Sequence, residues 1–216
     1  MGPAPTSPFH EKKLQLIWHE LMTNFSPGFI CCWGVHHLDI AQWGLGADDT
    51  GPDTVEGSGV FPKGGTCDTI LNWQARFEYR DRAPVTFVSN GKGIPMGVHF
   101  IGESASVHVR RGSIKADNEA LLRDPQNKYG QMPVKLPVSA DHQKDFVNAV
   151  RNGTRPICDT ETAVRSDTLG QLALIAIQQG RKLQWDPKAE GFVNDGAAEA
   201  MLQPRQFRGN WELPTV

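Results

Sequence analysis

The clearest hydrophobic pattern in the chain lies between residues 29 and 43, where apolar side chains recur at spacings of three, four and seven. The series consists of Phe29, Trp33, Ile40 and Trp43. Such spacing is typical of a helix with one buried stripe. A Pro-Gly pair precedes the series and two glycines follow it. The pattern therefore predicts a helix that begins after Gly28, is stopped by Gly44 and Gly46, and packs its tryptophans into the core.

Between residues 52 and 115 the pattern changes to short β-favouring runs separated by turn residues. The runs cover residues 66–79, 85–88, 98–101 and 107–110, and the last strand is expected to end at Gly112. Asn90-Gly91 supplies the positive φ angles that a tight hairpin turn needs. This section predicts hairpins that form an antiparallel sheet.

Helical spacing returns after residue 138. Ser139 is expected to cap a helix that runs to Asn152 and buries Phe146, Val147 and Val150. The segment before it, 116–138, has no clear period, and no regular structure is expected there.

A second helix is predicted from Asp159-Thr160 to Gly180, and it is apolar nearly all round. Such a helix belongs in the interior, so we expect it to be the most buried helix and to pack on the sheet. Residues 181–187 are expected to be extended, a short helix is expected within 194–202, and Trp211 is expected to anchor the end of the chain.

The order of these elements indicates the fold class. A helix, then antiparallel strands, then helices predicts an α+β domain of two layers, with an open, mostly antiparallel sheet and helices on one face. The alternation that a Rossmann fold requires is missing, and the glycine cluster 91–97 contains Pro95 and lies between strands. We expect residues 1–13 to be an extended connector and residues 14–216 to be a single domain.

Composition narrows the classes of partner. The chain has 216 residues and a formal net charge of −2, which gives no electrostatic surface for nucleic acid or anionic lipid. No apolar run approaches the roughly 18 residues of a membrane-spanning helix. The four cysteines do not follow a disulfide pattern, so free thiols are expected. The chain shows no export signal, and its compartment stays open.

Several motifs, in order along the chain, resemble the C-terminal half of the Gfo/Idh/MocA oxidoreductases. The matching segments are Gly2-Pro3-Ala4-Pro5, Trp33-Gly34-Val35-His36-His37-Leu38-Asp39-Ile40-Ala41-Gln42-Trp43-Gly44-Leu45-Gly46, Gly51-Pro52, Val55-Glu56-Gly57-Ser58-Gly59 and Gly180-Arg181-Lys182-Leu183-Gln184-Trp185-Asp186-Pro187. The resemblance spans nearly the whole chain. It implies a substrate-binding and oligomerisation domain whose family partner is an N-terminal Rossmann domain that holds NAD or NADP.

The resemblance also implies a catalytic residue. His36 matches the histidine of the family's Asp-x-x-x-His pattern and would act on the substrate hydroxyl, a role that suits an imidazole with an ordinary pKa near 6.5. Two departures accompany this match. The family's aspartate is Cys32 in this chain, and the family's Glu-Lys-Pro tripeptide is absent from it. The chain alone is therefore expected to bind no coenzyme and to be inactive.

Four further residues are candidates for substrate binding, each with a structural alternative. His37 would bond neighbouring backbone or a subunit, and Asp39 would tie down a helix end or a loop. His142 shares the expected buried stripe of its helix and would fill the helix–sheet boundary. Arg165 would reach a carboxylate or a sugar hydroxyl, or else form a salt bridge.

The leading hypothesis is the substrate-binding half of an NAD(P)-dependent oxidoreductase that acts on a sugar or polyol. The first alternative is a non-catalytic module that binds carbohydrate or forms a homo-oligomer through the open sheet, because its helices are too few to cover every apolar strand residue. The strand residues in question are Ile70, Trp73, Phe77 and Tyr79. The second alternative is a metal-dependent lyase or hydrolase, with Cys32, His36 and Asp39 on one helix face, although structural zinc requires four ligands.

Overall fold

The computed structural model describes residues 3–89, 93–123 and 138–207. The α-helices are α1 (Leu16–Glu20), α2 (Phe29–Cys32), α3 (Val35–Leu45), α4 (His142–Asn152), α5 (Thr160–Gln179) and α6 (Gly196–Glu199), and the 3₁₀ helices are η1 (Glu11–Leu14), η2 (Glu119–Arg123) and η3 (Ala200–Leu202). The strands are β1 (Thr54–Val60), β2 (Asn72–Glu78), β3 (Val85–Val88), β4 (Val98–Ile101), β5 (Ser106–Arg110), β6 (Ser113–Ala116), β7 (Leu183–Asp186) and β8 (Gly191–Phe192). This order confirms the α+β class.

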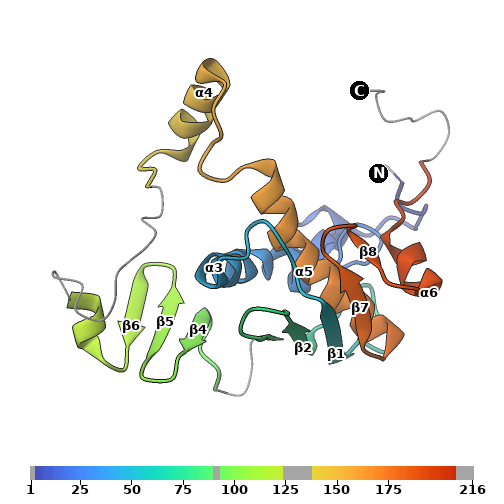
Figure 1. Cartoon of the computed structure of the whole chain (residues 1–216). Helices are drawn as coiled ribbons and strands as arrows, with labels where there is room; N and C mark the ends of the chain where they lie inside the picture. The colour runs from blue at the N-terminus through green and yellow to red at the C-terminus, as the bar shows by residue number, and fades with distance from the viewer. Residues whose placement is uncertain (1–2, 90–92, 124–137, 208–216) are drawn as a thin grey trace.

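The strands form two open antiparallel sheets. The larger one has the order β3-β2-β1-β7-β8, and the smaller one has the order β4-β5-β6. In the larger sheet Val55 of β1 is the register partner of Phe77 of β2, and both side chains are buried beneath α5. The helices α2, α3 and α5 lie on one side of this sheet (Figure 1). The predicted two-layer arrangement therefore holds for the larger sheet, and the smaller sheet is an addition to it.

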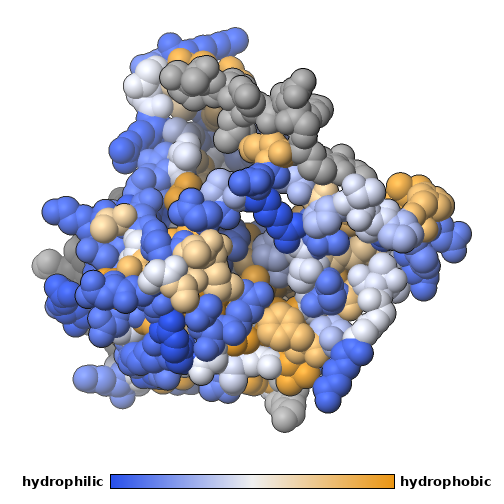
Figure 2. Space-filling model, turned by 90° about the vertical axis from the view of Figure 1, so that its right-hand side faces the viewer, coloured by the Kyte–Doolittle hydropathy of each residue, from blue (hydrophilic) through white to orange (hydrophobic). Residues whose placement is uncertain are grey.

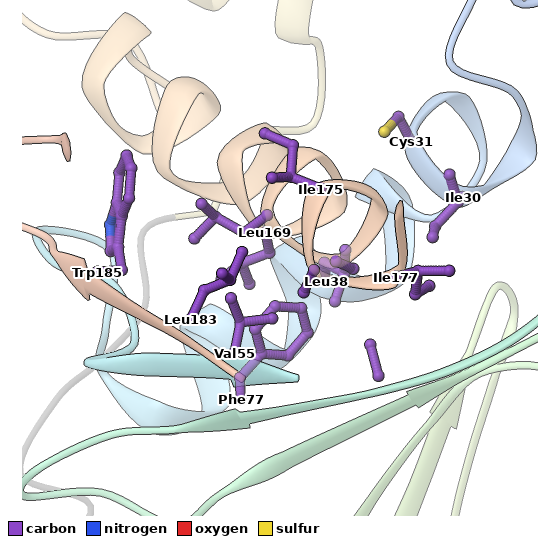
Figure 3. Packing of buried hydrophobic residues seen from close by; sticks show 14 of the residues in the cluster. Ile30, Cys31, Leu38, Val55, Phe77, Leu169, Ile175, Ile177, Leu183 and Trp185 are labelled. Carbon is purple, nitrogen blue, oxygen red and sulfur yellow. The ribbon is translucent and has the colours of Figure 1, made fainter. Parts of the chain in front are cut away.

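The core lies between α5 and the larger sheet. Asp159 caps the first turn of α5 by accepting a hydrogen bond from the backbone N–H of Thr162 at 2.9 Å, and Gly180 ends the helix with a φ of 64°. Leu169 and Leu172 are fully buried, and each such side chain contributes about 1.5–3 kcal/mol of hydrophobic stabilisation. Figure 3 shows side chains of α5, of α2 and α3 and of the strands packed together in this core. The most buried helix is therefore the one that the sequence predicted.

The predicted helix over residues 29–43 is two helices, α2 and α3, and its expected buried stripe is wrong. The chain turns between the two segments, so the spacing that the sequence shows does not fall on one face. Ile30, Cys31 and Leu38 face the core instead, whereas Trp33 and Trp43 are 46% and 38% exposed.

The expected burial on α4 is also wrong. Asp141, rather than Ser139, caps this helix. Phe146 and Val150 are 62% and 68% exposed, Val147 is exposed as well, and Ala149 is the buried residue of the helix. Figure 1 shows α4 standing away from the sheets. Its amphipathic pattern is real, but no other described element covers its apolar side.

The apolar strand residues expected to await a partner are largely covered. Ile70, Phe77 and Tyr79 are buried, and Trp73 is half-buried. The other face of the larger sheet is mostly polar, and there Glu56 is the register partner of Arg76. The sheet therefore lacks the apolar face on which the expected homo-oligomer was based.

The remaining expectations concern the ends of elements. The last strand of the smaller sheet does not end at Gly112, because Gly112 turns with a φ of 69° and the chain continues into β6. The short helix expected within 194–202 is confirmed as α6 and η3. Asn90-Gly91 and Trp211 lie outside the described residues.

Seen from the side of β8 and α6, the surface is largely hydrophilic, with apolar residues in separate groups (Figure 2). Within the described ranges, no helix combines the length and the hydropathy that crossing a bilayer demands.

A buried hydrogen-bond network fixes the connection between α3 and β1. Gln42 is fully buried, and its amide Nε2 donates to the carbonyl oxygens of Ala47 at 2.9 Å and Thr50 at 3.2 Å. The hydroxyl of Tyr79 donates to Gln42 Oε1 at 2.7 Å, and burial raises the pKa of this tyrosine. One side chain of α3 thus satisfies two loop carbonyls and a strand residue.

We predict that Gln42→Leu lowers the free energy of unfolding by about 2–4 kcal/mol. The substitution removes the side-chain partner of the Tyr79 hydroxyl and of the Thr50 carbonyl, and it leaves the Ala47 carbonyl with only the backbone N–H of Thr50. Gln74→Leu, at an exposed position on β2, is the matched control and should change stability by less than about 0.5 kcal/mol. Urea unfolding of both variants checks this. Equal losses would contradict the structural role of Gln42.

Candidate functional site

The candidate site lies where α2 meets α3. The backbone N–H of Gly34 donates to the carbonyl of Phe29 at 2.9 Å, a bond five residues back instead of four. Widened turns of this kind often accompany functional positions. A Cβ on Gly34 would lie 2.2 Å from the carbonyl oxygen of Ile30 and 2.7 Å from the Phe87 ring. Only glycine fits there, and the turn it allows sets the direction in which Trp33 and His36 leave the helices.

Three elements of this junction bring aromatic and cationic groups together. His36 is exposed, and its ring meets the Trp33 ring edge-on, with centroids 5.3 Å apart. Arg111, in the turn between β5 and β6, places its guanidinium carbon 5.6 Å from the centre of the Trp33 ring. His37, the next residue of α3, is half-buried beside them. We call Trp33, His36, His37 and Arg111 the junction cluster.

A close contact holds the smaller sheet against α3. Phe100 of β4 fills the space above Gly44, where a Cβ would lie 2.1 Å from the phenylalanine ring. This contact fixes β4, and pairing through β5 carries the turn that contains Arg111. The position of Arg111 next to Trp33 therefore depends on tertiary packing.

The junction cluster contains one guanidinium, that of Arg111, beside two imidazoles. The pKa of His37 lies below its ordinary value, first because burial disfavours the charged ring and then because of the charges of His36 and Arg111. Lowered pKa values keep an imidazole neutral and able to accept a proton near neutral pH.

Cys32, which the resemblance predicts to stand in place of the family's aspartate, has an acidic neighbour. Its thiol donates to Glu20 Oε2 at 3.6 Å. Burial, and then the carboxylate of Glu20, raise the pKa of the Cys32 thiol to about 11, and burial raises the pKa of the adjacent Cys31 thiol as well. Both thiols are protonated at neutral pH and are poor nucleophiles. The carboxylate near the junction is thus supplied by Glu20, from the segment before the helix.

The other predicted substrate residues lie apart from the cluster or are engaged elsewhere. Asp39 accepts a hydrogen bond from Ser166 at 2.7 Å and so ties α3 to α5. Arg165 pairs with Glu161 and Glu190 at 2.7 and 2.9 Å and donates to the carbonyl of Pro187, which leaves its guanidinium engaged. His142 is exposed on α4. The structure therefore brings His36 and His37 together. The side chains of Asp39 and Arg165 are engaged in contacts elsewhere, and His142 lies on a different helix, α4.

The metal alternative finds no assembled ligand set. Cys32 is bonded to Glu20 and Asp39 to Ser166, and the described part of the chain contains no group of three or more His, Cys, Asp or Glu side chains placed to hold a metal ion. A cavity of about 410 Å³ does lie at one end of the larger sheet, bordered by Asp53, Arg80 and Lys188 among others, but it includes none of the predicted site residues.

Sequence reasoning missed Glu20, Arg111 and the exposure of Trp33. Arg111 stands beside Gly112, which was expected to end the sheet, so the sequence placed it near a turn but not near α3. Glu20 carries no motif, and only its distance to Cys32 marks it.

We predict that Glu20→Gln speeds alkylation of Cys32 by iodoacetamide near pH 9, because removing the carboxylate lowers the pKa of the thiol from about 11. Peptide mass spectrometry measures the rate at each cysteine. Glu11→Gln is the control and should leave the alkylation rate of Cys32 unchanged. The alkylation rate of Cys67 should be unchanged in both variants. An unchanged Cys32 rate in Glu20→Gln would contradict the contact.

We also predict that Arg111→Gln raises the pKa of His37, because the positive charge of Arg111 is one cause of its lowered value. An NMR titration of the histidine ring protons measures this shift. Arg110→Gln removes the neighbouring exposed arginine and should move the His37 pKa less. A larger shift of the His37 pKa in Arg110→Gln than in Arg111→Gln would contradict the position of Arg111 in the junction cluster.

Comparison with known proteins identifies the family. A profile described as "Oxidoreductase family, C-terminal alpha/beta domain" matches residues 1–213. No curated protein sequence matches the chain significantly. An NAD-binding protein from Listeria innocua has a similar fold, with a TM-score of 0.52 at 16% identity, over 76% of this chain and 53% of that one.

An oxidoreductase from Thermotoga maritima is similar as well, with a TM-score of 0.51 at 14% identity, over 84% of this chain and 51% of that one. The chain thus spans about half the length of these structures. With the profile matched along nearly its whole length, this chain belongs to the Gfo/Idh/MocA oxidoreductase family and corresponds to its C-terminal α/β domain.

Proposed function

We propose that this chain is the substrate-binding half of an NAD(P)-dependent oxidoreductase that acts on a sugar or polyol, with His36 as its general base. In the oxidation, the carbinol carbon gives up its hydride to a nicotinamide held by another domain, and His36 takes the hydroxyl proton. The observation that carries the proposal is the exposure of His36 beside Trp33, at the residue that matches the family's histidine.

The coenzyme must come from outside the described residues. A dinucleotide site needs a glycine-rich turn that leads from a strand into a helix N-terminus. Here the glycine cluster 91–97 connects β3 to β4, two strands of different sheets. The chain's own contribution is therefore to bind the substrate, to orient its hydroxyl group and to accept a proton at the His36 ring.

Glu20 supports this assignment. The family's carboxylate is replaced by Cys32, but the thiol of Cys32 hydrogen-bonds to Glu20, so a negative charge remains at the junction. A carboxylate in this region favours the imidazolium that forms when His36 accepts a proton. With Cys32 in place of the aspartate, the carboxylate near the junction is therefore that of Glu20.

The non-catalytic alternative rests on the same replacement, because a neutral thiol cannot orient an imidazole as a carboxylate does. A protein of this kind would retain carbohydrate binding and lack turnover. The mostly polar face of the larger sheet gives little support to association through it, so the expected homo-oligomer stays a prediction.

The test is reconstitution. The purified chain with NAD or NADP and a panel of sugars and polyols should produce no reduced nicotinamide, whereas the chain joined to or co-expressed with the family's nucleotide-binding half should. In the active form, His36→Gln should lower kcat by about 10²–10⁴-fold, the usual contribution of a general base. His99→Gln, at an exposed position on β4, is the control. Full activity of His36→Gln, or turnover by the chain alone, would refute the proposal.

A further inference from the structure

Arg111 is a cation at the candidate site that has no ion-pair partner among the described residues. It is exposed, it lies over the Trp33 ring, and in the part of the chain that the structure describes it forms no ion pair with an acidic side chain. Two other arginines of the fold are engaged by acidic side chains: Arg165 with two glutamates, and Arg181 with Asp195. A cation held near a histidine without an acid of its own is available to a ligand.

The contact with Trp33 positions Arg111 without using its hydrogen-bond donors. A cation over an aromatic ring is attracted to the face of that ring, and this attraction leaves the N–H groups of the guanidinium free. The planar fork of an arginine matches the two oxygens of a carboxylate or a phosphate group. Trp33, with about half its surface exposed, adds an apolar wall next to this fork.

Arg111 supplies the positive charge of the junction cluster, whereas the nearby carboxylate of Glu20 is hydrogen-bonded to the thiol of Cys32. His36 and His37 lie in the same cluster, and the pKa of His37 is lowered first by burial and then by the charges of His36 and Arg111. The overall charge of the chain is slightly negative, so this positive charge is a local feature and not a property of the whole surface.

We propose that Arg111 selects substrates that carry an oxyanion group, so that the sugar bound beside His36 is a sugar acid or a sugar phosphate. This inference rests on the proposed function for the place of the substrate and adds its chemical class. The carboxylate or phosphate lies against the guanidinium of Arg111, the sugar ring lies along Trp33, and the carbinol that reacts is presented to His36.

The experiment measures binding to the chain alone, with no coenzyme. Glucuronate, glucose 6-phosphate and glucose are titrated separately, and NMR follows the indole proton of Trp33 and the ring protons of His36. At least one of the two acids should bind more tightly than glucose, and the acid that does so identifies carboxylate or phosphate as the group recognised.

Variants of Arg110 and Arg111 show which of these two adjacent arginines binds the acidic group of the ligand. Arg111→Gln should weaken binding of the preferred acid by about 10- to 100-fold, the size expected for a hydrogen-bonded charge pair. Arg111→Lys keeps the charge but not the fork and should recover only part of this loss. Arg110→Gln should bind like the unaltered protein, and circular dichroism of each variant confirms folding.

Three results would overturn the proposal: equal affinity for glucose and the acids, no binding of either acid, or an equal loss in Arg110→Gln. Because no redox step is measured, failure of the oxidoreductase assignment would leave the binding result intact. Equally, turnover of neutral sugars in the reconstituted enzyme would support the assignment and reject the role of Arg111.

Discussion

The packing of α5 across the larger sheet is the constraint on which the rest of this structure depends. Leu169, Leu172 and Ala176 are fully buried against strands that contribute Val55 and Phe77. Burial of this kind is the main favourable term in folding. The helices α2 and α3 pack beside α5 on the same side of the sheet, where Gly34 approaches Phe87 of β3, and Trp33 and His36 at their junction are exposed.

The junction itself combines two requirements that only glycine meets. Gly34 permits the close approach of Ile30 and Phe87, and Gly44 permits the approach of Phe100. The first opens the turn that presents Trp33 and His36, and the second brings the smaller sheet to α3. Two glycines near opposite ends of α3 therefore help to bring together the helix junction and the smaller sheet, whose β5–β6 turn holds Arg111.

The chain corresponds to the C-terminal domain of its family and spans about half the length of the similar structures. Its described residues bring an imidazole, an indole and a guanidinium together at the junction of α2 and α3. An exposed apolar stripe on α4, with Phe146 and Val150, accompanies these features on an element that projects from the fold (Figure 1). Under the proposed function, the coenzyme is held by another domain, and substrate binding is measurable on this chain.

The sequence by itself determined the fold class, the family, the strands β2 to β5 and the buried helix α5, because these follow from local periodicity, capping residues and ordered motifs. The role that it assigns to His36 stays a prediction. Only the tertiary structure decided which apolar stripes are covered. The sequence predicts buried apolar residues on both α4 and α5, but those of α5 pack on the sheet whereas Phe146 and Val150 of α4 are exposed. Likewise, Cys32 meets Glu20, and Trp33 meets Arg111, only through contacts between distant segments. Periodicity shows that one face of a helix is apolar. Whether that face is buried depends on elements elsewhere in the chain that pack against it, and a local sequence pattern does not contain this information.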